Sequence, residues 1–279
     1  MAHLINKISV PLVFIITCFM AVCIFSPHVL AFDHGHTDWD RLLKKHVVVT
    51  KKGNASQVRY ADFQKDSKSL KQYLESLSAV TIKEFKSWSK SHQLSFLINA
   101  YNAFTIELIL TRYPDIESIW DTGSFIVKPW RKKFFTLLGQ KRYLDEVEHN
   151  MIRKKGVYDD ARIHFAVNCA SIGCPALRNE AFVYDQLDKQ LENSLIRFLS
   201  DTSRNTFNSK TNTLEVSKIF DWYMEDFSQN GSKFSSLEAF FAAYAHLFSS
   251  HPEALKRIRE MSVNITFLKY DWDLNDVKK

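Results

Sequence analysis

Two cysteines and two histidines near the middle of the chain are the side chains best suited to chemistry. Cys169 and Cys174 lie with His164 in the segment RIHFAVNCASIGCPAL, residues 162–177, and His149 precedes this segment. A thiol becomes a nucleophile when a neighbouring base takes its proton. With Cys169 as the nucleophile and His164 or His149 as its base, these residues predict a hydrolase or an acyl transferase.

The same side chains have two other interpretations. Cys169 and Cys174 could bind a metal ion together with His149 and His164. Their C-x4-C spacing is at the edge of the common zinc spacings and no second paired motif accompanies it, so we predict neither a metal nor another cofactor. Alternatively, the two cysteines could form a disulfide across a short loop, with His164 buried in the core. The chain would then be a non-catalytic binding or scaffold module.

A β-strand is expected to position His164. Apolar residues alternate with His164, Ala166 and Asn168 over residues 163–168, which is the period of a strand. His164 and Asn168 would therefore share one face of the strand. Cys169 would follow where the strand ends and a Gly- and Pro-containing loop begins.

Two helices would bring further polar groups to this strand. Apolar residues recur at helical spacing over residues 85–112, where we predict the longest helix. Asn99 and Asn102 lie three apart on its apolar side, and a buried amide is costly unless it is hydrogen-bonded. These amides would either tie the helix to a neighbouring loop or face a cleft, where they could orient an imidazole or donate to an oxyanion. His149 is expected on a short helix over residues 146–154.

The remaining pattern indicates a single α+β domain over residues 32–279, with helices packed on a mostly antiparallel sheet. Asp145 and Glu148 form a capping-box-like start for the helix that carries His149. The aromatic fraction of 14%, with 22 Phe, indicates a core built on large side chains or a groove lined by them. The other helices are predicted over residues 67–78, 184–199, 237–248 and 253–261, and the strands over 58–60, 125–127, 134–137, 142–144, 207–208, 212–216 and 263–268.

The first 31 residues have the composition of a secretory signal. Lys7 precedes an apolar run over residues 8–25, and Val29-Leu30-Ala31 resembles a signal-peptidase site, so we predict cleavage after Ala31 and export to the periplasm or beyond. An uncleaved membrane anchor is the alternative. Cleavage would make His34 the third residue, where it could chelate Cu(II) or Ni(II), although a polar tail before a helix is the simpler interpretation.

The charge of the chain restricts its partners only broadly. The formal net charge is +6, and it becomes +5 without the leader because Lys7 is the only charged residue there. Export argues against nucleic acid as a partner. The mild basic excess fits an anionic envelope surface or a protein partner, or it is a solvated face, and we expect a membrane contact only if the leader is retained. The identity of the partner stays unknown.

Five blocks of sequence carry a resemblance to a known family. In chain order they are INAYNAFTIELIL, EVEHNMIR, RIHFAVNCASIGCPAL, SKIFDWYMEDF and YDWDLN. Together they resemble the family called domain of unknown function 547, over about residues 40–275. This resemblance implies an exported protein, and it implies no reaction because the family has none established. The polar positions that it carries over are Asn99, Tyr101, Asn102, His149, His164, Asn168, Cys169, Cys174, Trp222, Asp226, Asp271 and Asn275.

A weaker likeness concerns the thiol enzymes. A helix followed by a strand bearing His-Phe-Ala is similar to the transglutaminase and papain-like enzymes, in which a cysteine on the helix meets a histidine on the strand. Here the matching helix offers Asn99 and Asn102 and no cysteine. The departure leaves two alternatives: Cys169 supplies the thiol from a rearranged position, or the scaffold binds without catalysis.

Overall fold

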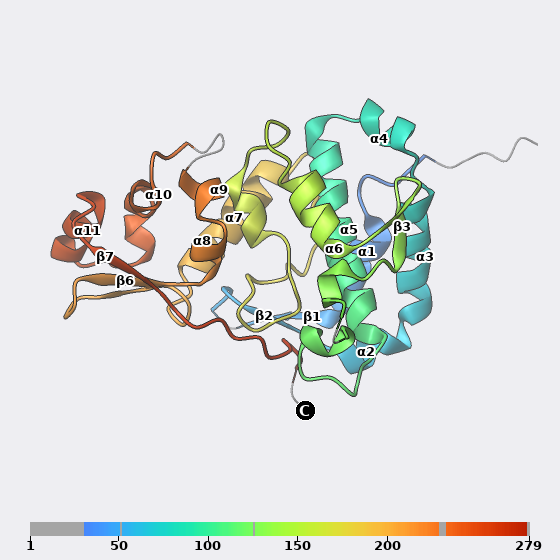
Figure 1. Ribbon diagram of the computed structural model, residues 1–279, viewed down its shortest axis with the longest axis horizontal. Coiled ribbons are helices and arrows are strands. Elements are labelled where there is room, and N and C mark those ends of the chain that lie inside the picture. The colour runs from blue at the N-terminus through green and yellow to red at the C-terminus, as the bar shows by residue number, and fades with distance from the viewer. Residues whose placement is uncertain (1–30, 51, 125, 229–232, 278–279) are drawn as a thin grey trace, which may run out of the picture. The chain divides into compact units, whose positions relative to one another are not determined.

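The computed structural model describes residues 31–277 except for 51, 125 and 229–232 (Figure 1). Residues from Phe32 onward form one compact unit. The predicted leader lies outside the described residues apart from Ala31. Among the helices that the structure describes, none combines the length and the apolar character needed to cross a bilayer.

Helices make up about half of the described chain. Those of regular type are α1 (Thr37–His46), α2 (Tyr60–Lys65), α3 (Ser67–Ala79), α4 (Ile82–Ser87), α5 (Lys90–Leu110), α6 (Leu144–Glu146), α7 (Leu187–Leu199), α8 (Ile219–Trp222), α9 (Met224–Ser228), α10 (Leu237–Ala243) and α11 (Pro252–Arg259). Short 3-10 helices are η1 (Ile119–Thr122), η2 (Pro129–Arg131), η4 (Ala161–Phe165) and η5 (Ala245–Leu247), and η3 (Val147–Ile152) is a π-helix.

The strands form three small sheets. Two are antiparallel pairs, β1 (Val47–Val49) with β2 (Ser56–Val58) and β3 (Phe135–Leu137) with β4 (Gln140–Arg142). The third sheet has the order β5 (Thr206–Asn208), β6 (Thr213–Val216), β7 (Asn264–Phe267), in which β6 pairs with β5 antiparallel and with β7 parallel. Helices with small sheets confirm the α+β prediction, although the strands do not join into one sheet.

Helix α5 is the centre of the first hydrophobic core. The Ser89 side chain accepts a hydrogen bond from the backbone N–H of His92 and caps the helix. Residues 94–106 of α5 are all buried, and such all-round burial is typical of a helix enclosed by other elements. It contacts α3, α6, η1 and η3. The helix is therefore a fixed support for whatever its buried polar side chains hold.

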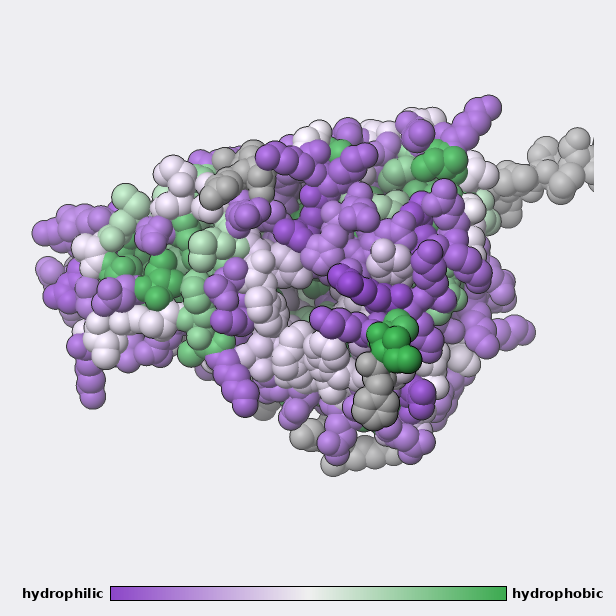
Figure 2. Space-filling view, in the orientation of Figure 1, coloured by the Kyte–Doolittle hydropathy of each residue, from purple (hydrophilic) through white to green (hydrophobic). Residues whose placement is uncertain are grey.

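A second core lies under the three-stranded sheet. It joins buried residues of α7, β6, α8, α9, α10 and α11, among which Phe220 and Phe227 are fully buried. Partly buried apolar side chains also gather on the surface over α10, α11 and β7 (Figure 2). Most of the aromatic residues therefore belong to the two hydrophobic cores.

The segment after β7 connects the two cores. It runs from the three-stranded sheet back to β2, where Asp276 bridges Val58 in parallel (Figure 1). On the way, Leu274 pairs with Ser171, and the Asn275 backbone N–H donates to Ala170 O at 3.0 Å. This path places residues 270–272 beside the loop that contains the two cysteines.

Two local predictions were wrong. Residues 161–165 form a 3-10 helix, so His164 and Asn168 do not share the face of a strand. The side chain of Asn102 takes the Ala166 carbonyl and the Asn168 N–H, which a neighbouring strand would otherwise use. The expected capping box at residue 145 is also absent, because the helical segment begins at Leu144, two residues before the predicted start, and Tyr143 at its cap position makes no side-chain cap. The strand predicted at residues 125–127 falls partly outside the described residues.

Candidate functional site

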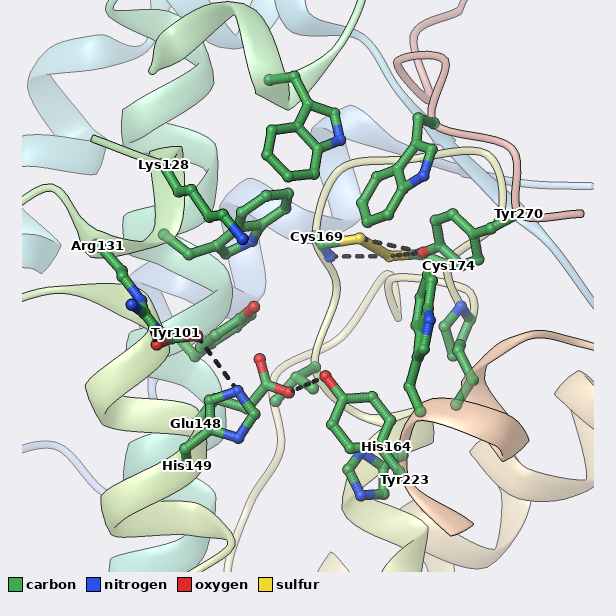
Figure 3. Close-up of a pocket in the computed structure, with 18 residues that line it drawn as sticks. Tyr101, Lys128, Arg131, Glu148, His149, His164, Cys169, Cys174, Tyr223 and Tyr270 are labelled. Carbon is green, nitrogen blue, oxygen red and sulfur yellow. Dashed lines mark hydrogen bonds and ion pairs between the residues drawn. A yellow bond between two sulfur atoms is a disulfide. The ribbon is translucent and has the colours of Figure 1, made fainter. Parts of the chain in front are cut away.

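A cavity of about 280 Å³ opens where residues of the first core face residues of the second (Figure 3). Six of the residues predicted for a site line it: Tyr101, His149, His164, Cys169, Cys174 and Trp222. The other lining residues are Trp120, Lys128, Trp130, Arg131, Asp145, Glu148, Val167, Pro175, Ile219, Tyr223, Tyr270 and Trp272. Together, the lining residues come from α5, from η1, from η2 and the residue before it, from α6 and η3, from η4 and the loop after it, from α8 and the residue after it, and from the segment after β7.

Indole rings form much of the wall of the cavity. Four of the six tryptophans in the chain lie there, with Trp120 against Trp130 at a centroid distance of 4.8 Å and Trp222 against Trp272 at 5.6 Å. Trp120 and Trp222 are 42% and 44% exposed. Large aromatic side chains usually bury most of their surface on folding, so indoles left open around one hollow suggest that something covers them.

The carboxylate of Glu148 lies deep in the cavity. It is 7% exposed and accepts a hydrogen bond of 2.7 Å from the Tyr223 hydroxyl and another from the Tyr101 hydroxyl. Burial, followed by the negative charge of Glu148, raises the pKa of both tyrosines well above the usual value. The two phenols therefore stay protonated and act as donors to this carboxylate.

His149 is held in one tautomer by its neighbours. The guanidinium of Arg153 can only donate, and its Nη1 contacts His149 Nδ1. The proton of a neutral imidazole then lies on Nε2, which is 3.2 Å from the Asp145 carboxylate. Both ring nitrogens are thus engaged, which does not suit a base for Cys169.

His164 belongs to a second polar group behind Tyr223. Its Nε2 is 2.7 Å from Asp226 Oδ2, which also accepts a 2.6 Å hydrogen bond from Arg153 Nε. Its ring stacks on Tyr223 with the centroids 4.0 Å apart. Burial lowers the pKa of His164, and the Asp226 carboxylate offsets part of that effect. Burial alone would raise the pKa of Asp226, but the hydrogen bonds from His164 and Arg153 hold it well below its usual range.

The two cysteines are joined in a disulfide. The hydroxyl of Tyr270 lies 3.2 Å from each sulfur, and the backbone N–H of Cys169 donates to Cys174 Sγ at 2.9 Å. Figure 3 shows the disulfide and Tyr270 on one side of the cavity and His164 on the far side of Tyr223 from them. The structure therefore does not bring Cys169 and His164 together as a nucleophile and its base.

Three of the predicted asparagines fix the framework around the cavity. Asn99 bonds both the N–H and the carbonyl of Phe182, at 3.0 and 2.7 Å. Asn102 does the same for the segment before the cysteines, donating to Ala166 O at 2.9 Å and accepting from Asn168 N at 2.8 Å. Asn168 in turn donates to the carbonyl of Pro175 at 2.8 Å. Of the two roles considered for Asn99 and Asn102, tying the helix to loops is the one observed.

The last two carried-over residues also lie away from the cavity. Asn275 is buried and accepts a 2.8 Å hydrogen bond from the Tyr60 hydroxyl. Asp271 is exposed, and its carbonyl accepts from Gly173 N at 2.9 Å. Both hold the segment after β7 in place.

The comparisons with known proteins bear on the middle of the chain. Residues 85–199 match the family described as protein of unknown function, DUF547. Three of the five sequence blocks lie inside this match, which confirms the predicted resemblance there, whereas SKIFDWYMEDF and YDWDLN lie beyond it. No curated protein and no solved structure matches the chain. The weaker likeness to transglutaminase and papain-like enzymes is not shown.

Several lining residues were not predicted as part of a site. Glu148 was assigned only to a helix cap, and Lys128, Arg131, Trp120 and Trp130 were not singled out. Tyr223, Tyr270 and Trp272 lie inside the family-like blocks, so their clustered aromatics were the available signal. Within the described part of the chain, no group of three or more His, Cys, Asp or Glu side chains is placed to hold a metal ion.

Proposed function

We propose that this domain binds a small ligand in the tryptophan-lined cavity and that its disulfide serves a structural role. The observation that carries the proposal is the gathering of four of the six tryptophans around one hollow of about 280 Å³, two of them more than 40% exposed. Mostly apolar cavities with a few convergent polar groups are the usual form of small-molecule sites.

The groups needed for thiol catalysis are engaged in other interactions. Both sulfurs are in the disulfide, and a sulfur in that state cannot attack a substrate as a thiolate. His149 is held between Arg153 and Asp145, and His164 is held by Asp226. These contacts favour binding over the Cys/His hydrolase or acyl transferase activity.

The cavity also suggests the general form of the ligand. Indole rings offer flat apolar surfaces, so the ligand should have an apolar face. Glu148 and the two tyrosine hydroxyls lie deeper, so the ligand should also reach them with a polar group. We further propose that binding occurs outside the cytoplasm, as the leader predicts; a disulfide persists in such oxidising compartments.

Ligand titrations of the purified protein test this proposal. A panel of sugars, amino acids, amines and carboxylates would be followed by tryptophan fluorescence and by NMR. We expect Trp222→Ala to weaken binding by about tenfold, since exposed aromatic anchors carry much of the energy of a binding site. Trp88→Phe is the matched control, because Trp88 packs against Phe85 and Phe96 away from the cavity.

Two results would contradict the proposal. One is binding that Trp222→Ala leaves unchanged. The other is hydrolysis of an ester or thioester that disappears in Cys169→Ser, together with labelling of Cys169 by a thiol probe in the unreduced protein. The second result would instead support the hydrolase.

A further inference from the structure

We infer that the ligand is a small organic cation, a quaternary or tertiary ammonium ion whose charge lies near Glu148 while its alkyl groups pack on the indoles. The inference deepens the proposed function and rests on it. It depends on the charges and ring faces of the cavity.

Glu148 is a buried acidic group that lacks a cationic partner. Its neighbours within hydrogen-bonding distance are the neutral hydroxyls of Tyr101 and Tyr223. Among the described residues, no lysine, arginine or histidine forms an ion pair with it. A buried carboxylate is costly unless it is paired, and two hydrogen bonds from neutral donors replace only part of its hydration. An incoming cation would complete its surroundings.

The aromatic lining favours the same charge. Four indoles and the rings of Tyr101, Tyr223 and Tyr270 surround the cavity. The faces of such rings carry negative potential, and Trp attracts a cation most strongly. A quaternary ammonium ion suits this environment because its alkyl groups bury apolar surface while the positive charge is spread over them. An anion would meet ring faces of the wrong sign.

Two cationic side chains, Arg131 and Lys128, also line the cavity, but they contribute less than Glu148 to the electric field inside it. Arg131 has a side chain that is 68% exposed and already pairs with Asp145 at 3.2 Å. Lys128 is exposed on a loop, although Figure 3 shows its side chain directed toward the cavity. Solvent and salt screen exposed charges strongly and buried ones weakly. Glu148 therefore contributes most to the field inside.

Three ligands of nearly equal shape separate charge from size. Choline carries a positive charge, 3,3-dimethylbutan-1-ol is its neutral counterpart, and 3,3-dimethylbutanoate is negative. Each would be titrated into the full chain by calorimetry at two salt concentrations. We expect choline to bind about ten- to a hundredfold more tightly than the alcohol, the range that attraction to a buried carboxylate and desolvated cation–π contacts supply, and the anion to bind most weakly.

Two variants assign the effect to the cavity. Glu148→Gln keeps the shape of the side chain and removes its charge. It should reduce the preference for choline over the alcohol to less than about threefold, a difference no larger than that made by a typical uncharged hydrogen bond. Lys128→Ala removes an exposed charge, is expected to fold, and should tighten choline binding while weakening any binding of the anion. Glu253→Gln is the control, because Glu253 is exposed on α11 and does not line the cavity.

The outcomes distinguish this inference from the function on which it rests. Equal binding of choline and the alcohol, or tighter binding of the anion, overturns the cation while leaving a ligand-binding cavity in place. If none of the three ligands binds at millimolar concentration, the cation is again contradicted, and the broader panel decides on the cavity. Co-sedimentation with phosphatidylcholine vesicles that choline displaces would identify a lipid headgroup as the source and overturn a free small ligand.

Discussion

Removal of the Cys169–Cys174 disulfide gives the sharpest test of what the cysteine loop does. The two residues are five apart in sequence, so the cross-link closes one of the shorter loops that a disulfide can span. The loss of loop entropy in the unfolded chain then stabilises the fold by about 2 kcal/mol. We expect the double substitution Cys169→Ser with Cys174→Ser to lower the free energy of unfolding by about that amount.

Urea denaturation of four samples measures this effect. The samples are the wild-type protein and the double variant, each with and without a reductant. The reduced wild-type protein should match the double variant, and the reductant should not change the double variant, which thus controls for effects of the reductant elsewhere. A similar slope against urea in all four samples would show that the unfolded states are comparable.

One pattern of results would refute the structural role of the loop. If Cys169 and Cys174 are alkylated in the unreduced native protein, and the double variant is as stable as the wild-type protein, the thiols are free. The Cys/His hydrolase would then again be the leading interpretation of the site. Intact mass of the native protein, two hydrogens lighter than the reduced form, is the result we expect.

Three further predictions concern the framework. Asn102→Ala leaves one N–H and one carbonyl of residues 166–168 buried without partners and should cost about 2–4 kcal/mol in urea denaturation; a loss under 1 kcal/mol would mean that water replaces the amide. Burial lowers the pKa of His36 from 6.5 to about 3, so only the unfolded state binds its proton between these values. The free energy of unfolding should therefore fall by about 1.4 kcal/mol per pH unit as the pH drops through this window. His36→Asn should remove this dependence. The same loss of stability at acid pH in the variant would contradict the prediction. Gly173→Ala places a Cβ 2.8 Å from the Asp271 backbone oxygen and 2.9 Å from the Tyr270 ring, so we expect a loss of about 1–3 kcal/mol and weaker ligand binding. Unchanged thermal unfolding would show that the backbone of the segment after β7 moves aside freely, together with the ring.

The elements that depend on local patterns were predicted well. The apolar spacing of residues 67–78 matches α3, and the core of the segment predicted as the longest helix is α5. The hairpin of β3 and β4 was predicted near its place, although β4 begins at Gln140, two residues before the strand predicted over 142–144. Leu138 and Gly139 both have positive φ, as a two-residue hairpin requires. In these cases, the groups that satisfy the backbone lie within a few residues of one another.

The segment around His164 shows why other parts could not be predicted. Its alternating pattern suits a strand, but its backbone is satisfied by the side chain of Asn102, more than sixty residues earlier. A single sequence does not show that this amide is available. Asn99 acts in the same way on Phe182, so both asparagines hold loops against α5.

The residues of the site could be predicted only in part, because they come from segments far apart in the sequence. Residues of the family-like blocks do meet at one cavity, but the indoles come from four separate segments, and a tryptophan in sequence is as consistent with a core as with a site. Trp39 and Trp222 illustrate the ambiguity, because the first is fully buried and the second is half exposed. Only the return of the chain after β7 closes the ring of aromatics.

Two adjacent residues on η3, His149 and Glu148, have roles that differ from those predicted from the sequence. His149 was expected to act as a base, yet Arg153 and Asp145 engage both of its nitrogens. Glu148, its neighbour, lies inward between two tyrosine hydroxyls and has no countercharge among the described residues. Within one helical turn, therefore, the histidine supports the wall while the carboxylate faces the cavity, which is the arrangement that the proposed recognition of a cation requires.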